Sequence, residues 1–557
     1  MVVELWSAGQ GTAEERPRYA LVRVPSPPVD RFVVLPVDNG KNLVMYLDDV
    51  IRYNLPALFP DQHVGDSFAV KLTRDTDLHL EDEDELGVTL VEAIRKSLGK
   101  RTTGLPSRFL YDQEAPQDVI SRLKEWLSLS DHDFIAGGRY HNLSDFFGFP
   151  RFGRDDLSFP RWEPIPHPVL HGAPSIFALM REKDRIAHFP YQLFDPVVRF
   201  LDEAGGDPDV DEMWLTVYRV AKDSAVLTAL LKAAEAGKKV NVFMEVQARF
   251  DEATNLEWAA RMEVASVNTM YSIPGLKVHA KLAMARRSEG DGHRLYAYLA
   301  TGNLNEKIAG LYADHGLLTR DERLTRDVRE VFRFLAGEIE EIVPKHLLVA
   351  PSTMRSGFYD LIKAEAKAAR AGEPSGMILK MNSLEDTKII KKLYKASKAG
   401  VPIQLIVRGI CRLATGLPGQ SENITARSIL DRYLEHARIY IFHAGGEEKI
   451  YLASADWMKR NLSRRIEVAF PIYDPDVKAE LRQLIDIQLA DNHKGQGPQR
   501  QAGQHSFATR RRRGACPLAG GLSRVVEGPD LKPPGVGAWL LTDDRSPVPE
   551  SVDHGTR

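Results

Sequence analysis

The residues best suited to chemistry lie in one stretch, 271–307, which reads YSIPGLKVHAKLAMARRSEGDGHRLYAYLATGNLNEK. His279 and Lys281 stand two positions apart in an apolar run, and a second apolar run leads to Asn303 in a Thr-Gly-Asn sequence. If 276–285 is one strand, alternation places His279 and Lys281 side by side on one face. A second strand at 295–300 would deliver Asn303 at its end, where α/β sheets usually hold their ligands. The alternative is a core histidine beside a lysine whose stem is buried and whose ammonium reaches solvent.

An internal repeat favours the functional interpretation. The stretch DSAVLTALLKAAEAGKKVNVFMEVQAR, which starts at Asp223, aligns without gaps with DTKIIKKLYKASKAGVPIQLIVRGICR, which starts 163 positions later at Asp386. Further along, HAR at 436–438 resembles HAK at 279–281, and SAD at 454–456 resembles TGN at 301–303. We therefore predict two like domains that arose by duplication, packed about a pseudo-twofold axis with their half-sites in one cleft.

Two imidazoles, a lysine, several arginines and no carboxylate cluster describe a site for a polyanion that transfers a phosphoryl group. One neutral histidine can attack phosphorus and carry the group covalently, while the other gives or takes a proton. Arginines hold phosphates with bidentate geometry. Because no GxxxxGK[ST] sequence occurs, a nucleotide would have to be held in a way other than by a P-loop.

The bulk composition excludes several classes of protein. The chain has 557 residues, of which 43% are hydrophobic and 27% charged, with a net charge of −3, so several ordinary globular domains are expected. This balance gives no whole-chain argument for a nucleic-acid partner. Two cysteines cannot form a disulfide framework, which fits a reducing, cytoplasmic setting. We expect neither a signal peptide nor a membrane span.

The order of patterns along the chain predicts the domain organisation. Residues 1–165 read as an α+β head domain, with strands at 18–23, 31–36, 68–80 and 108–112, helices at 45–58 and 90–98, an acidic loop at 81–85, and a linker at 148–171. Residues 166–346 form a first α/β/α domain, with strands at 213–220 and 240–246 and helices at 224–236 and 323–342. Residues 347–490 form the second. Residues 491–557, rich in Gly, Pro, Ser, Gln and Arg, are predicted to be a disordered tail.

The two copies resemble the phospholipase D-type fold, and residues from about 17 to 490 resemble the first family of long-chain polyphosphate kinases. The stretches that carry this resemblance are HFPYQLFDPVVRFL, YRVAKDS, VFMEVQARFDE, LKVHAKL, ATGNLNEK, DRYLEHARIYIF, SADWMKRNLSRRIEVAFPI and DIQLADN. The resemblance implies reversible transfer of the terminal phosphate of ATP to inorganic polyphosphate through a phosphohistidine, with Mg²⁺.

Residue by residue, the resemblance implies that His279 becomes phosphorylated and that His436 assists transfer beside the nucleotide. Arg219 and Arg249 match the arginines of the magnesium–phosphate site; a guanidinium cannot ligate a cation, so they are interpreted as phosphate holders.

Tyr312 and Arg408 match residues that contact the nucleotide. Lys281, as a catalytic residue, and Asn303, as a phosphate contact, are additions from the repeated pattern itself. His443, seven residues after His436, competes with it for the second role.

The resulting expectation is an ATP:polyphosphate phosphotransferase in the cytoplasm that binds ATP or ADP and polyphosphate, takes no nucleic acid, and forms a homo-oligomer, with peripheral membrane association left open. Two alternatives stay open. The family's first helical domain carries an SWLxFN-like segment that does not occur here, so the chain is also interpreted as a truncated, catalytically weak or silent polyphosphate-binding protein. The other alternative is a phospholipase D-like phosphodiesterase that uses the same histidines.

Overall fold

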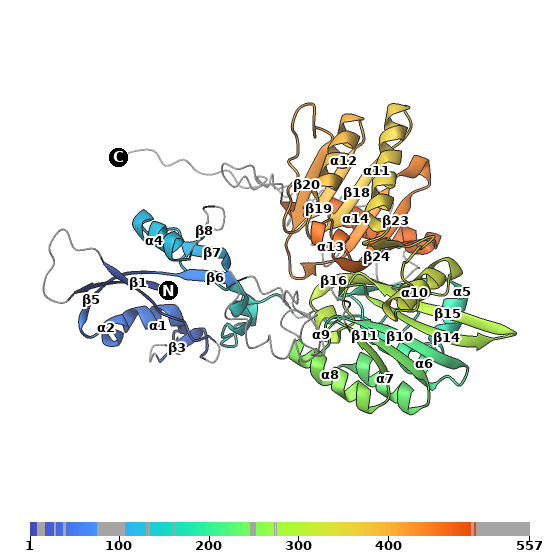
Figure 1. The fold of residues 1–557 in the computed structure, drawn as a ribbon, viewed down its shortest axis with the longest axis horizontal. Helices are drawn as coiled ribbons and strands as arrows, with labels where there is room; N and C mark the ends of the chain where they lie inside the picture. The colour runs from blue at the N-terminus through green and yellow to red at the C-terminus, as the bar shows by residue number, and fades with distance from the viewer. Residues whose placement is uncertain are drawn as a thin grey trace, which may run out of the picture. The chain divides into compact units, whose positions relative to one another are not determined.

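The computed structural model separates the chain into two compact units, Met1–Arg161 and Trp162–Arg557, which are described one at a time (Figure 1). The structure describes residues 1–7, 17–26, 29–36, 40–74, 106–127, 129, 131, 134–160, 162–245, 252–271, 273, 276–491 and 495–496.

The first unit combines three small sheets with short helices. The sheets have the strand orders β2-β1-β5, β3-β4 and β6-β7-β8. The elements are β1 (Val2–Ser7), β2 (Arg18–Leu21), β3 (Phe32–Leu35), β4 (Leu43–Tyr46), α1 (Leu47–Tyr53), α2 (Leu55–Leu58), β5 (Gln62–Phe68), β6 (Val70–Arg74), β7 (Pro106–Asp112), α4 (Gln117–Leu127) and β8 (Phe134–Gly137). The amphipathic helix α4 buries Val119 and Leu123 against Phe109 of β7, so the expected α+β head is confirmed.

Two details of the head domain differ from the sequence prediction. The helix expected over 45–58 starts only at Leu47, because Leu43–Tyr46 pairs with β3, and it breaks at Asn54. The strand expected over 68–80 is interrupted at Ala69, and its continuation is β6. The acidic loop at 81–85 and the helix at 90–98 lie outside the described residues.

The second unit holds two α/β domains in succession. The elements of the first are α5 (Ile176–Glu182), β9 (Arg185–Phe189), α6 (Asp195–Gly206), β10 (Val210–Val217), α7 (Ala225–Glu235), β11 (Lys239–Met244), α8 (Glu252–Val264), β12 (Asn268–Tyr271), β13 (Lys277–Val278), β14 (Leu282–Glu289), β15 (Gly292–Ala300), α9 (Glu306–Ala309), β16 (Tyr312–Thr319) and α10 (Glu322–Leu335).

The elements of the second are β17 (Leu348–Ala350), α11 (Met354–Arg370), β18 (Met377–Met381), α12 (Thr387–Lys398), β19 (Ile403–Val407), β20 (Ile424–Ile429), β21 (Leu434–Glu435), β22 (Arg438–Phe442), β23 (Lys449–Ala453), α13 (Lys459–Ser463), β24 (Arg465–Pro471), α14 (Pro475–Ala490) and β25 (Gly495–Gln496).

The two sheets repeat one topology. The first runs β12-β11-β10-β14-β15-β16, with β9 on β16, and the second runs β20-β19-β18-β22-β23-β24, with β17 on β24. Each sheet then gains one short strand from the other domain: β21 joins β16, and β13 joins β24. The expected duplication of an α/β/α domain is therefore confirmed, and the copies are joined by exchanged strands.

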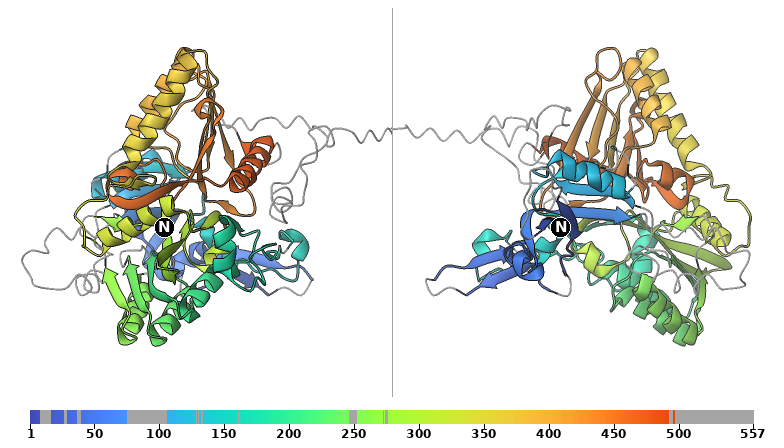
Figure 2. Two further views of the ribbon diagram at one scale, coloured as in Figure 1. Left: turned by 90° about the vertical axis from the view of Figure 1, so that its right-hand side faces the viewer. Right: turned by 60° about the vertical axis from the view of Figure 1, so that its left-hand side comes forward.

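Helices cover both faces of the second sheet, and α11 and α12 lie along one of them (Figures 1 and 2). Residues that alternate along β18 divide between two cores, because Leu379 packs with α11 and α12 while Ile378 faces the other side. The second core is shared: α10 of the first domain and α14 of the second pack within it against strands of both sheets. The two domains therefore fold around a common apolar layer.

Three sequence predictions for this unit need correction. The single strand expected over 276–285 is wrong, because β13 and β14 belong to different sheets and the chain between them, 279–281, is not strand. The helix expected over 323–342 ends at Leu335, and Gly337 then takes a positive φ of 72°. Gly495–Gln496 of the predicted disordered tail pairs with β20, while 492–494 and 497–557 lie outside the described residues. None of the helices that the structure describes has the length and apolar character needed to cross a membrane.

Candidate active site

The exchanged strands place both histidines at the boundary between the two domains. His279 follows β13, and its backbone N–H and that of Ala280 both donate to the carbonyl of Ile466, at 2.9 and 3.0 Å. His436 follows β21, and its N–H and that of Ala437 both donate to the carbonyl of Ala313, at 3.2 and 2.8 Å. Each histidine is thus anchored by the backbone of the opposite domain.

Each histidine side chain also meets a carboxylate of the opposite domain. Nδ1 of His279 lies 2.9 Å from Oε2 of Glu467, which accepts a 2.5 Å hydrogen bond from the Ser454 hydroxyl and, at Oε1, a 2.6 Å bond from the Asn461 amide. With Nδ1–H directed at a carboxylate, Nε2 is the nitrogen that can attack phosphorus.

The second half-site repeats this arrangement. Nδ1 of His436 lies 2.8 and 3.0 Å from the two carboxylate oxygens of Asp314, which accepts a 2.7 Å hydrogen bond from the hydroxyl of Thr301. Glu435, directly before His436, is buried and held by Lys380 at 2.5 Å and Gln488 at 3.0 Å. Both imidazoles therefore have a fixed orientation.

Burial sets the protonation of these groups. It lowers the pKa of His279 well below its ordinary value; Glu467 opposes this shift, and the cations Lys281 and Arg465 reinforce it. Burial and then Arg438 lower the pKa of His436. Burial opposes ionisation of Glu467, but the contact with His279 and the nearby Arg465 hold its pKa below its ordinary value. The site thus pairs neutral imidazoles with ionised carboxylates near pH 7.

Lys281 is buried under an aromatic ring beside His279. Its ammonium donates to the backbone carbonyl of His279 and lies 5.1 Å from the centre of the Tyr218 ring, which packs edge-on against the His279 imidazole at 4.7 Å. The guanidinium of Arg219 lies 5.7 Å from the same ring centre. The structure therefore gathers His279, Lys281 and Arg219 around Tyr218, a residue that the sequence interpretation did not select.

Arg438 takes the place of Lys281 in the second half-site but makes different contacts. Its NH1 lies 3.0 Å from Nε2 and 3.3 Å from Nδ1 of His436, and its NH2 and Nε donate to Asp456 at 3.0 and 3.3 Å. Asp456 also accepts hydrogen bonds from the amide N–H groups of Asn382 at 2.7 Å and Ser383 at 3.2 Å.

Arg408 joins this network from the end of β19. Its Nε and NH2 donate to the side-chain oxygen of Asn382 at 3.0 and 2.9 Å, and the Asn382 amide donates to the backbone carbonyl of His436 at 3.1 Å. The ring centre of Tyr312 lies 5.2 Å from that of His436. The two predicted nucleotide contacts, Arg408 and Tyr312, are therefore both grouped with His436.

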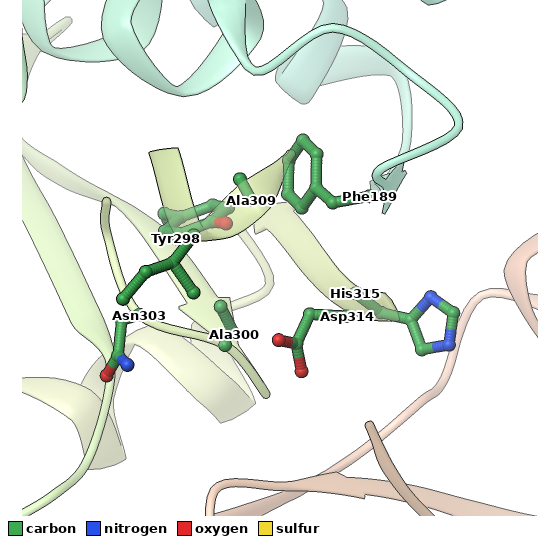
Figure 3. A pocket seen from close by; sticks show the side chains of 9 residues that line it. Phe189, Tyr298, Ala300, Asn303, Ala309, Asp314 and His315 are labelled. Carbon is green, nitrogen blue, oxygen red and sulfur yellow. The ribbon is translucent and has the colours of Figure 1, made fainter. Parts of the chain in front are cut away.

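Asn303 lines a small enclosed cavity behind Asp314 (Figure 3). Its volume of about 10 Å³ is room for roughly one water molecule and excludes a nucleotide. Figure 3 shows the Asp314 carboxylate turned toward Ala300 and the His315 ring turned away from both. Gly302 is required here, because a Cβ at this position would lie 2.3 Å from an Asp314 oxygen.

Two further sequence predictions have different outcomes. His443 lies at the far end of β22 from His436, where it caps a single 3₁₀ turn by accepting a hydrogen bond from Gly446, so the structure does not group it with the site. Arg249 lies outside the described residues.

The sequence interpretation missed the carboxylates. It expected a site without a carboxylate cluster, and this is wrong, because Asp314, Glu467 and Asp456 all contact its bases. A signal was present: Asp314 follows Thr301 by 13 positions, and Glu467 follows Ser454 by the same 13 positions. Lys281 lies within the electrostatic reach of Glu467 in one half-site and of Asp314 and Arg438 in the other, so the two half-sites adjoin.

Comparison with known proteins agrees with this geometry. Three domain families match the chain in succession: the polyphosphate kinase middle domain over residues 1–149, the polyphosphate kinase C-terminal domain 1 over 175–341, and the polyphosphate kinase C-terminal domain 2 over 347–515.

Individual relatives extend over most of the chain. It is 42% identical over 485 residues to the polyphosphate kinase of Escherichia coli K12, covering 86% of this chain and 70% of that protein, and 42% identical over 488 residues to the enzyme of Salmonella typhimurium LT2. The crystal structure of polyphosphate kinase from Porphyromonas gingivalis superimposes with a TM-score of 0.74 at 37% identity, covering 94% of this chain and 76% of that one. These findings support the kinase interpretation and neither alternative. The chain belongs to the polyphosphate kinase family.

Proposed function

We propose that this kinase transfers the terminal phosphate of ATP reversibly to inorganic polyphosphate through a phosphohistidine on His279. The observation that carries the proposal is the His279–Glu467 pair: a buried, neutral imidazole whose Nδ1 is fixed by a carboxylate and whose Nε2 is the remaining nucleophile. A covalent intermediate divides one difficult transfer into two easier ones.

The proposed first step forms a bond between Nε2 of His279 and the terminal phosphorus of ATP. The bond from that phosphorus to the bridging oxygen breaks, and ADP leaves with the electron pair. Glu467 stabilises the Nδ1–H of the phosphorylated ring, and Lys281 and Arg219 neutralise charge on the phosphoryl oxygens. In the second step the terminal oxygen of a polyphosphate chain attacks the same phosphorus and restores His279.

His436 is proposed to act beside the nucleotide. Its Nδ1–H is held by Asp314, as in the other half-site, so once Arg438 turns toward phosphate its Nε2 can accept a proton and, when protonated, donate one. Arg408 and Tyr312 flank it and are proposed to contact ATP. Arg249 is proposed, with Arg219, as a phosphate holder.

Magnesium is proposed to enter with the nucleotide, as MgATP. Guanidinium groups cannot ligate a cation, and no group of three metal-ligating side chains occurs among the residues that the structure describes. The described residues therefore do not form a magnesium cage of their own, whereas Mg²⁺ commonly binds through substrate phosphates and water. No step of the proposed mechanism passes through a protein-bound metal.

The test is incubation with γ-labelled ATP and Mg²⁺, followed by digestion and identification of the labelled peptide. The expected result is an acid-labile label on His279 that is lost in His279→Ala and that is transferred to polyphosphate when unlabelled polyphosphate is added. Retention of the label by His279→Ala would refute the assignment. Release of an alcohol from a phosphodiester, with no polyphosphate formed from ATP, would favour the phosphodiesterase instead.

A further inference from the structure

The two half-sites share one geometry but differ in charge. The repeat-related positions that differ in charge or donor type include Glu245 with Arg408, Lys281 with Arg438, Asn303 with Asp456, and Arg465 with Tyr312. The last two pairs lie 153 positions apart, as do the carboxylates Asp314 and Glu467 that hold the histidines. From the His279 half to the His436 half, the neutral amide of Asn303 is replaced by the carboxylate of Asp456, and the guanidinium of Arg465 by the phenol of Tyr312.

The His279 half is consequently the more positive one. The cations Lys281, Arg465 and Arg219 lie around His279 with the carboxylates Glu467 and Glu245. Around His436 lie two cations, Arg438 and Arg408, and two carboxylates, Asp314 and Asp456. Burial lowers the pKa of Lys281, so the difference that does not depend on its protonation is the local one between Asn303 and Asp456.

Asp456 is built into the second half-site as an ionised group. It is buried, and besides the Arg438 guanidinium it accepts hydrogen bonds from two backbone amides, those of Asn382 and Ser383. Burial opposes its ionisation, but Arg438 holds the pKa of Asp456 below its ordinary value. Asn303, its counterpart, buries a side-chain oxygen without a hydrogen-bond partner in the described part of the chain. A carboxylate is therefore stabilised at one repeat position and not at the other.

We propose that Asp456 determines which histidine carries the phosphoryl group, by neutralising Arg438 and placing a negative charge where a phosphohistidine on His436 would stand. This inference rests on the proposed function and adds the reason why the covalent step occurs in one half only. Charges a few ångströms apart in a poorly solvated cleft interact strongly enough to decide between two otherwise similar nucleophiles. Asp456 acts through Arg438 and the local field, so it is a positioning residue.

The test makes the His436 half-site resemble the His279 half-site in a chain from which the first nucleophile, His279, has been removed. In His279→Ala combined with Asp456→Asn, Nε2 of His436 forms the bond to the terminal phosphorus of ATP, ADP leaves with the electron pair of the broken P–O bond, and Asp314 keeps the Nδ1 proton. The probe is γ-labelled ATP with Mg²⁺. We expect label on the His436 peptide at about ten times the level in His279→Ala alone or more.

The matched control keeps the charge and changes the shape. His279→Ala combined with Asp456→Glu is expected to stay unlabelled, because its carboxylate still neutralises Arg438. Equal labelling of the Asn and Glu variants, or no labelling of the Asn variant when its thermal unfolding midpoint matches that of His279→Ala, would overturn the proposal.

A reciprocal variant gives an answer if the double variant does not fold. Asn303→Asp introduces a carboxylate at the repeat position of Asp456, in the domain that carries His279, and is expected to lower labelling of His279 about tenfold relative to Asn303→Ala. Equal labelling of these two variants would contradict the inference. The wild-type chain, measured in parallel, separates the outcomes: absence of label on its His279 refutes the proposed function, whereas labelled His279 with unresponsive variants refutes only the role of Asp456.

Discussion

At the level of single residues, the site consists of two hydrogen-bonded triplets. Each joins a histidine to a carboxylate of the other domain and then to a hydroxyl. Glu467 and Ser454 serve His279, and Asp314 and Thr301 serve His436. A carboxylate on Nδ1 fixes the tautomer and stabilises positive charge that develops on the ring. The two triplets are equivalent in geometry, so a substitution in one can be compared with the equivalent substitution in the other.

We predict that Glu467→Gln lowers the rate of His279 labelling on the order of 10³-fold, because a neutral amide no longer selects the Nδ1–H tautomer or stabilises the ring's charge. Quenched-flow measurement with γ-labelled ATP would give the rate. Asp314→Asn is the matched comparison: it disturbs only His436, which acts beside the nucleotide without bonding to phosphorus, so labelling of His279 is expected to fall much less than in Glu467→Gln. Equal loss of labelling in both variants would contradict the assignment of His279 and His436 to different roles.

The labelling step should also resist acid more than an ordinary histidine would. The attacking form is the neutral imidazole, which persists above the pKa of the group, and burial lowers the pKa of His279 below 6.5. As pH falls from 7.5 to 6.5 the neutral fraction therefore changes little, and the rate declines only at lower pH. A single-turnover pH profile measures this, and a midpoint near 6.5, that of an unperturbed histidine, would contradict the burial argument.

Gly302→Ala should disturb His436 indirectly, through Asp314. The added Cβ would lie 2.3 Å from an Asp314 oxygen, so the carboxylate must move and its bonds to His436 weaken. We expect transfer to polyphosphate to fall about tenfold, as for the loss of roughly 1.4 kcal/mol of transition-state stabilisation. Gly310→Ala is the control, because there the nearest heavy atom to an added Cβ is 3.5 Å away. Identical rates for Gly302→Ala and wild type would show that Asp314 has room to adapt.

At the level of secondary structure, short strands and helix starts hold these residues in place. β13 and β21 are two residues each, yet they carry the chain into the opposite sheet directly before each histidine. Helix α7, which follows β10, is capped by Ser224, and the equivalent helix α12, which follows β18, is capped by Asp386. Because Asp386 aligns with Asp223 and not with Ser224, the second helix begins one position earlier in the repeat.

We predict that Asp386→Ala lowers the free energy of unfolding by about 1 kcal/mol, because its carboxylate accepts hydrogen bonds from the first-turn amides of Lys388 and Ile389 at 3.0 and 2.9 Å. Urea denaturation followed by tryptophan fluorescence measures the change. Lys391→Ala, on an exposed position of the same helix, is expected to change the midpoint little. A shift of equal size in both variants would rule out a capping effect.

At the level of the whole molecule, the two α/β domains form one folding unit around the core that α10 and α14 share. Each domain supplies the carboxylate and the backbone carbonyl that anchor the other's histidine, so neither could present a complete half-site alone. The chain up to Arg161 forms a separate compact unit.

Leu481→Ala should therefore destabilise both α/β domains together. The side chain of Leu481 is fully buried on α14 in the shared core, and a leucine-to-alanine change at such a position costs about 2–5 kcal/mol. Scanning calorimetry of the full chain should show one transition for both domains moving to lower temperature. Leu430→Ala, where the side chain is 53% exposed, is the control. Two separate transitions, of which only one shifts, would show that the domains unfold independently.

The sequence by itself determined the duplication, the α/β class of both copies and the repeated pattern of a histidine followed two positions later by a cation. These features depend on local periodicity and on the spacing of unusual residue types, which the linear order preserves. The 163-position offset aligned helix with helix and strand with strand. The similarity of HAK at 279–281 to HAR at 436–438 grouped His279 with Lys281 and His436 with Arg438 correctly, although the single strand drawn through His279 was wrong.

Only the tertiary structure decided which groups act on these histidines. Glu467 lies 188 residues from His279, and Asp314 lies 122 residues from His436, so no local pattern joins them. Strand exchange between the sheets brings them together, and exchange depends on how two complete domains pack. The same packing buries Lys281, pairs Arg438 with Asp456 and makes the half-sites unequal in charge, because burial and distance exist only in the folded chain.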